Sequence, residues 1–166
     1  MNQITRHYED STFIPASPQK VFDYVDDHSR LSSHMSQSSW MMGGGRMETS
    51  VDARRGQQVG SHIRLSGKAF GIPLFLDEVV IRHEPPHIKI WETVGTPKLF
   101  VVGPYRMEIE VSPQDGKSRL RVSIDYELPI ANAWLGKLFG GYYAKWCVQQ
   151  MIKGAQSYFT HLERQP

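Results

Sequence analysis

The segment from residue 131 to residue 163 constrains the fold most, because apolar side chains recur along it at three- and four-residue steps. This spacing predicts one long amphipathic helix. Gly140 and Gly141 mark a bend, a close approach of a strand, or a break between two helices. Such a long apolar stripe needs a large partner to cover it. The stripe consists of Trp134, Leu135, Leu138, Tyr142, Trp146, Val148, Met151, Ile152, Ala155, Phe159 and Leu162.

The preceding sequence supplies that partner, because much of it alternates between apolar and polar residues with a period of two. We expect a first strand over residues 5–14, two short helices after it, and about six strands over residues 46–128. Ser17 and Pro18 suit the start of the first helix. Asp115-Gly116 predicts a tight hairpin, because this pair adopts the positive backbone angles that such turns require. The order of elements predicts an α+β protein whose sheet and long helix enclose a cavity.

Composition narrows the class of protein. The 166 residues are 40% hydrophobic, which predicts one globular domain over residues 1–166. The formal net charge is only +2 and the basic residues form no run, so we expect no nucleic-acid partner. A single cysteine, Cys147, and the absence of a stretch of about 20 apolar residues favour a cytoplasmic protein. His83 and His87 have no third ligand at metal spacing, so we expect neither a metal nor another cofactor.

Residues 13–25, with the sequence FIPASPQKVFDYV, together with the order of elements, resemble the START-like (SRPBCC) superfamily. Within it, the chain resembles the polyketide cyclase/dehydrase-like proteins, also in residues 77–87, the Asp-Gly hairpin and the C-terminal helix. The resemblance implies a helix-grip fold, in which a curved antiparallel sheet of about seven strands wraps around the long C-terminal helix. It also implies two short helices after the first strand, and an apolar ligand between sheet and helix. The family hosts carriers, receptors and cyclases, so the fold alone does not define the activity.

Glu92 is the candidate catalytic residue. In strand register it shares a face with Ile88, Ile90 and Val94, so we expect its carboxyl group to point into the apolar interior. There it would suit a general acid or base. The alternative is a position at the rim of the sheet, paired with an arginine.

Asp77 and Glu78 are neighbours, so one of them must face the interior of the sheet. The residues on both sides of this strand are apolar, and the pattern does not say which side is inner. If a carboxylate from this strand meets Glu92, the two like charges would raise the pKa of one of them; if it meets Arg64 or Arg106, a structural ion pair is expected, and this is the favoured alternative.

Three functions are compatible with the sequence. The leading hypothesis is binding of a small hydrophobic molecule, lipid, polyketide-like or aromatic, by a monomer or homodimer. The first alternative is a cyclase, dehydratase or isomerase that uses Glu92. The second is a module that binds a membrane surface or a partner protein through Trp40-Met41-Met42 and an edge strand near Pro104. The residues expected to line the pocket are Trp40, Met42, Leu65, Glu78, Ile90, Glu92, Tyr105, Met107, Tyr126, Leu138, Tyr142 and Trp146.

Overall fold

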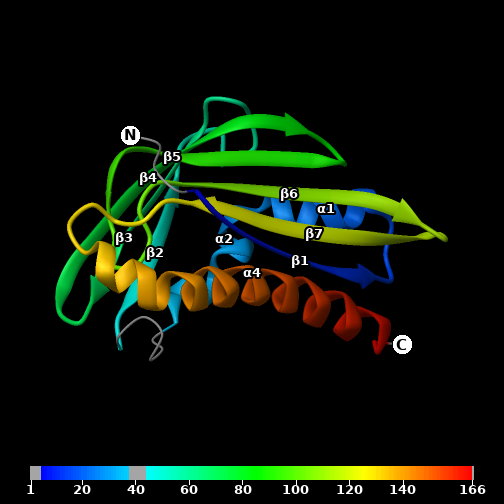
Figure 1. Ribbon diagram of the computed structural model, residues 1–166. Coiled ribbons are helices and arrows are strands. Elements are labelled where there is room, and N and C mark those ends of the chain that lie inside the picture. Colours follow the sequence, from blue (N-terminus) through cyan, green and yellow to red (C-terminus); the bar gives the residue numbers. More distant parts are fainter. Residues whose placement is uncertain (1–4, 38–43, 166) are drawn as a thin grey trace.

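One curved, seven-stranded antiparallel sheet and one long helix organise the molecule. The computed structural model describes residues 5–37 and 44–165. The strands follow the order β1-β7-β6-β5-β4-β3-β2 across the sheet. Figure 1 shows the long helix α4 running along the sheet, with the short helices α1 and α2 behind it. The predicted helix-grip architecture is confirmed. The strands are β1 (Arg6–Ile14), β2 (Arg46–Val51), β3 (His62–Ala69), β4 (Ile72–Glu84), β5 (Ile88–Lys98), β6 (Tyr105–Gln114) and β7 (Lys117–Tyr126); the helices are α1 (Pro18–Asp26), α2 (His28–Leu31), α3 (Ser33–Ser36) and α4 (Ala133–Glu163).

Local sequence signals set most of these boundaries. The Ser17 hydroxyl accepts a hydrogen bond from the backbone N–H of Lys20, and Pro18 is the first residue of α1. Asp115 and Gly116 have φ angles of 49° and 74° in the turn that joins β6 to β7, so the hairpin is confirmed.

The second of the two predicted short helices is divided into α2 and α3. The division falls at Ser32, whose hydroxyl donates to the backbone oxygen of His28 at 2.7 Å and also contacts the Thr49 hydroxyl at 2.7 Å. These bonds tie the helix pair to β2. They place His28 and Met35 where they face the interior.

The helix α4 is continuous through Gly140 and Gly141, so the break between two helices, one of the predicted alternatives, does not occur. A Cβ atom at Gly140 would lie 2.8 Å from the backbone oxygen of Val101, and one at Gly136 would lie 3.0 Å from the same oxygen. Ordinary side chains do not fit at such distances. Gly136 and Gly140 therefore allow the close approach of the segment around Val101, which is the connection between β5 and β6 and not the predicted strand.

This close approach changes which face of α4 is buried. The C-terminal half buries Val148, Ile152 and Phe159 as predicted. The N-terminal half instead buries small residues, because only they allow the neighbouring chain to come near. The predicted burial of Leu138 and Tyr142 is wrong, since these side chains are 58% and 71% exposed.

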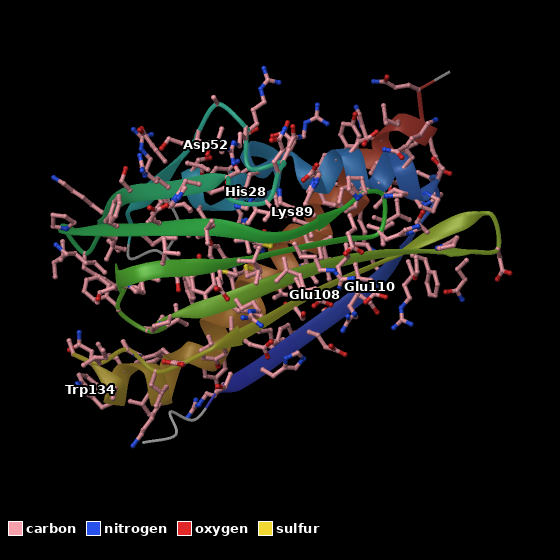
Figure 2. All side chains as sticks on the ribbon, turned by 90° about the horizontal axis from the view of Figure 1, so that it is seen from above. His28, Asp52, Lys89, Glu108, Glu110 and Trp134 are labelled. Carbon is pink, nitrogen blue, oxygen red and sulfur yellow. The ribbon has the colours of Figure 1, made fainter. Side chains whose placement is uncertain are left out.

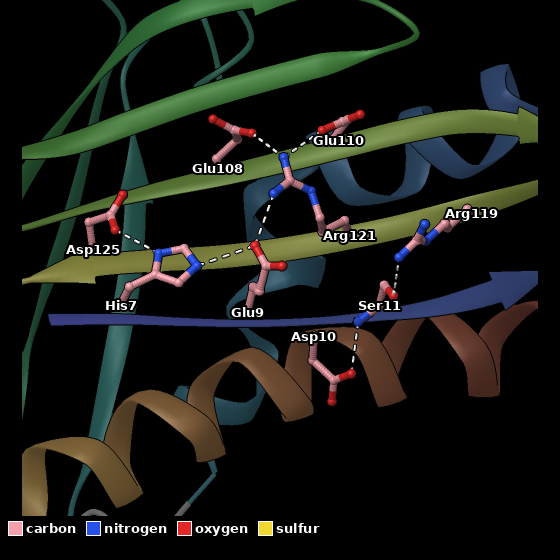
Figure 3. A network of polar contacts seen from close by, with 9 residues as sticks. All are labelled: His7, Glu9, Asp10, Ser11, Glu108, Glu110, Arg119, Arg121 and Asp125. Carbon is pink, nitrogen blue, oxygen red and sulfur yellow. Dashed lines mark hydrogen bonds and ion pairs between the residues drawn. The ribbon is translucent and has the colours of Figure 1, made fainter.

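The outer face of the sheet is polar where β1, β7 and β6 meet. Arg121 contacts Glu9 at 3.0 Å, Glu108 at 2.7 Å and Glu110 at 2.5 Å, and Asp125 binds the ring of His7 (Figure 3). Ion pairs exposed in this way contribute little to stability. They mark this side of the sheet as the solvent side.

The prediction of an edge strand near Pro104 is wrong. Pro104 directly precedes β6, which lies between β5 and β7 in the sheet, and the edges are formed by β1 and β2. The backbone oxygen of Pro104 accepts a hydrogen bond from the N–H of Glu127 at 2.9 Å. This stretch is therefore already paired.

Candidate functional site

A small cavity lies between the inner face of the sheet, the short helices and α4. Its volume is about 30 Å³, which is room for one or two water molecules. Leu65, Leu76, Met107 and Ile124 line it from four different strands, and Met151 lines it from α4. The cavity thus lies between sheet and helix, and most of its wall is apolar.

Some of the predicted pocket residues reach this cavity and others do not. Tyr126 is buried and Trp146 is half-buried, but both lie outside its lining. Trp40 and Met42 lie outside the described residues. The predicted residues that line the cavity are Leu65, Glu78, Tyr105 and Met107.

The predicted orientation of Glu92 is wrong, because the inner face of β5 is the opposite one. Trp91 is fully buried, whereas Ile90 and Glu92 point to the outer face. The guanidinium group of Arg106 donates to Oε2 of Glu92 from Nε at 3.0 Å and from Nη2 at 2.7 Å. This is the arginine pairing given as the alternative. Glu92 is not placed to act on a molecule in the cavity.

The other open assignment, on β4, is settled by the same alternation of faces. Glu78 is buried and faces the cavity, together with Leu76. Asp77 faces outward, where the ring of His62 lies 3.0 Å and Nε of Arg64 lies 3.7 Å from its carboxylate. The ion pair predicted for this strand therefore belongs to Asp77.

Glu78 is the centre of a buried polar group inside the apolar wall. Its Oε1 accepts hydrogen bonds from the indole N–H of Trp91 at 3.2 Å and from the hydroxyl of Tyr105. His28 lies on the other side, with Nε2 3.6 Å from Oε2 of Glu78 and its ring edge-on to Trp91. Burial lowers the pKa of His28, against the opposing effect of Glu78. The imidazole is thereby held neutral near pH 7.

A second buried polar group lies at the end of α1. The ammonium group of Lys89 is completely buried, 2.9 Å from Oδ1 of Asp26 and 3.1 Å from the backbone oxygen of the same residue. Nε2 of His83 is 2.9 Å from Oδ2 of Asp26. Burial lowers the pKa of Lys89, and Asp26 opposes that effect. Figure 2 shows Lys89 and His28 in the middle of the molecule, far from Trp134 at one end.

Cys147 lines the cavity beside Tyr143. Burial raises the pKa of its thiol to about 12, although a hydrogen bond with Tyr143 opposes this. A thiol with such a pKa is almost wholly protonated near neutrality, so it is no nucleophile there. The described part of the chain holds no group of three or more His, Cys, Asp and Glu side chains placed to bind a metal ion.

Several lining residues were not predicted as pocket residues, although Met151 was placed on the apolar stripe of the long helix. Tyr143, Cys147 and Met151 follow one another at four-residue steps on α4 and form its cavity-facing row. That spacing was a usable signal, but the larger residues one position earlier, such as Tyr142, obscured it. Helical spacing groups His28 with Leu31 and Met35 and suggested a place at the cavity entrance, but its neighbour Glu78 is remote in sequence, so the contact between them was not predicted.

A second hollow adjoins the cavity and reaches the surface. Its volume is about 60 Å³, and it shares the lining residues Leu99, Val102 and Tyr143 with the cavity. The rings of Phe70 and Phe100 also line it, with their centroids 6.1 Å apart. The shared residues form the wall between this hollow and the cavity.

A larger hollow of about 500 Å³ lies elsewhere, where β1 meets the C-terminal end of α4. Phe13, Gln156 and Arg164 are among its lining residues, and apart from Pro15 all of them are exposed. Exposed side chains exclude no water from a ligand. We therefore place the candidate site in the interior cavity.

A curved antiparallel sheet that grips a long C-terminal helix around an apolar cavity defines the START-like class of proteins. The family model described as "Polyketide cyclase / dehydrase and lipid transport" matches residues 5–159. The chain belongs to this family, as the sequence resemblance implied. It matches no curated protein sequence.

Solved structures share the fold at low sequence identity. The aromatase/cyclase ZhuI from Streptomyces sp. R1128 superposes with a TM-score of 0.71 at 12% identity, covering 97% of each chain. Norcoclaurine synthase from Thalictrum flavum, in complex with dopamine and hydroxybenzaldehyde, has a TM-score of 0.66 at 16% identity over 99% of this chain and 90% of that one. A protein from Thermus thermophilus has a TM-score of 0.68 at 18% identity, over 95% of this chain and 99% of that one. Identities this low establish the fold and leave the activity open.

Proposed function

We propose that the protein binds a small hydrophobic molecule in the cavity between the inner face of the sheet and α4. The observation that carries this proposal is the mostly apolar cavity wall, built from five strands and the helices α2, α3 and α4 and adjacent to a hollow beside Phe70. Sites for small molecules are typically concave and mostly apolar, with a few polar groups that fix orientation. The family to which the chain belongs supports the same class of ligand.

The cavity must enlarge to hold a molecule of more than a few atoms, because its space is only about 30 Å³. Met35, Met107 and Met151 all belong to its wall. Methionine side chains have three rotatable bonds and a polarisable sulfur, so they can repack around apolar molecules of different shape. We expect ligand binding to displace these side chains and leave the strands in place.

Substitutions at Cys147 test the location of the site. Phenylalanine at this position fills the cavity, so we expect Cys147→Phe to weaken binding of the uncharged apolar fluorescent probe N-phenyl-1-naphthylamine by about tenfold or more. Cys147→Ala, the matched control, enlarges the same space and should bind at least as well as the wild type. Fluorescence titration gives both affinities, and unfolding curves show that the variants are folded. Equal affinities for the two variants would place the probe elsewhere.

A second candidate function is contact with an anionic membrane surface, favoured by an exposed apolar row at the start of α4. Trp134, Leu138 and Tyr142 follow at four-residue steps and are 63%, 58% and 71% exposed. Lys137 and Lys145 are exposed on the same part of the helix. Aromatic residues and lysines in this arrangement suit the boundary between lipid headgroups and acyl chains. Among residues 5–37 and 44–165, no helix combines the length and hydropathy needed to cross a bilayer.

Vesicle flotation tests the membrane contact. With vesicles of phosphatidylcholine and phosphatidylglycerol, we expect Trp134→Ser combined with Leu138→Ser to lower the bound fraction by about tenfold, because two apolar side chains no longer enter the interface. Val59→Ser, at an exposed apolar residue in the loop before β3, is the matched control. Wild-type protein that stays at the bottom of the gradient, or a double variant that floats equally well, would exclude this surface.

A further inference from the structure

The cavity contains a carboxyl oxygen that the described protein groups do not satisfy. Glu78 is 2% exposed, and both hydrogen bonds that it accepts, from Trp91 and Tyr105, go to Oε1. Oε2 has no hydrogen-bond partner among the described residues, and Nε2 of His28 at 3.6 Å is too far away to be one. Within the same described part of the chain, Nδ1 of His28 has no partner either.

Such a group calls for a partner from outside the protein. A buried acceptor without a hydrogen bond costs about 1–3 kcal/mol, and more when it is charged. Nearly all buried polar atoms in folded proteins have a partner, which is a protein group, an ordered water or a ligand. Glu78 and His28 both line the cavity, so a molecule bound there can supply it.

The surroundings define the chemistry of that molecule. Oε2 is an acceptor, so the group that meets it must donate a hydrogen bond. A negatively charged ligand group would lie beside Glu78. Because the buried cation Lys89 is already paired with Asp26, such an anionic group is disfavoured. The remaining wall is mostly apolar, as at Leu76 and Met107, and its other polar side chains, which include Ser32, Tyr143 and Cys147, have partners within the protein.

We propose that Oε2 of Glu78 receives the polar end of the bound molecule, and that this molecule is an apolar compound with one hydrogen-bond-donating group, a hydroxyl or an amine. His28 provides the second polar contact beside it. This inference rests on the proposed function and specifies the ligand class for the same cavity. It assigns Glu78, and not Glu92, as the carboxyl group that contacts the ligand.

Three matched probes test the inference in the wild-type protein. Isothermal titration calorimetry compares 4-ethylphenol and 4-ethylbenzylamine, which both donate a hydrogen bond, with 4-ethylanisole, which does not. We expect the phenol or the amine to bind about tenfold more tightly than the anisole or better, since a hydrogen bond to a buried carboxyl group distinguishes them. The donor that binds more tightly shows whether the site prefers a hydroxyl or an amine.

Two variants on the same strand locate the effect. Glu78→Gln should reduce the preference for the donor probes to about threefold or less, whereas Asp77→Asn, whose side chain faces outward, should leave it unchanged. Equal binding of the anisole and the two donors by the wild type would overturn the inference and would leave the proposed function intact. The partner of Oε2 would then be a water molecule. An unchanged preference in Glu78→Gln would overturn the inference as well. If the wild type binds none of the probes, the proposed function fails too; if Glu78→Gln does not fold, the wild-type preference decides alone.

Discussion

Lys89→Met is expected to destabilise the fold by about 3–5 kcal/mol. The Lys89 ammonium group is completely buried and lies 2.9 Å from Oδ1 of Asp26. Methionine has a similar length but no charge, so the Asp26 carboxylate would remain in the interior with only His83 against it. Urea unfolding at pH 7, followed by tryptophan fluorescence, measures the loss.

Lys98→Met is the matched control, because Lys98 lies on the same strand and is far less buried. We expect it to change the free energy of unfolding by no more than about 0.5 kcal/mol. In the double variant Asp26→Leu with Lys89→Met, neither charge of this ion pair is left buried without its partner, so a large part of the lost stability should return. Equal stability of the two single lysine variants would show that the ion pair contributes nothing.

The orientation of β5 shows why the candidate site could not be predicted fully. Its alternation was correctly read, with Ile90 and Glu92 on one face and Lys89 and Trp91 on the other. The face with Ile90 and Glu92 was predicted to be the inner one, but the protein buries the opposite face, which contains Lys89. It can do so because α1 ends with Asp26 near this strand, and Arg106 on β6 pairs with Glu92 outside. Both partners are remote in sequence, so no local pattern reveals them.

The architecture, in contrast, depends on local signals. Ser17 with Pro18, and Asp115 with Gly116, fix a helix start and a hairpin through their own backbone preferences. Strand periodicity then orders the sheet between them. The buried face of α4 was predicted correctly only in the C-terminal half, where large apolar residues such as Ile152 and Phe159 are buried. Towards its N-terminal end the buried face consists of Gly136, Gly140 and other small residues, which hydrophobicity does not detect.

Acidification is expected to remove about 3 kcal/mol of stability through His34 alone. The ring of His34 packs edge-on against Trp146, with centroids 5.2 Å apart, and burial lowers its pKa from 6.5 to about 4. The unfolded chain therefore binds a proton at His34 at a higher pH than the folded protein does. Stability from this residue is complete above pH 6.5 and is lost as the pH falls towards 4. Urea unfolding between about pH 7.5 and 4.5 follows most of the loss.

His34→Leu isolates the contribution, because leucine keeps an apolar contact with Trp146 and cannot titrate. The free energy of unfolding of the variant should fall less steeply below pH 6.5, so that its stability relative to the wild type improves as the pH decreases. A residual slope is expected from His28, whose pKa burial also lowers. Parallel curves for variant and wild type would show that His34 gains a proton as easily in the folded state as in the unfolded chain. Its contact with Trp146 would then have to open to water in solution.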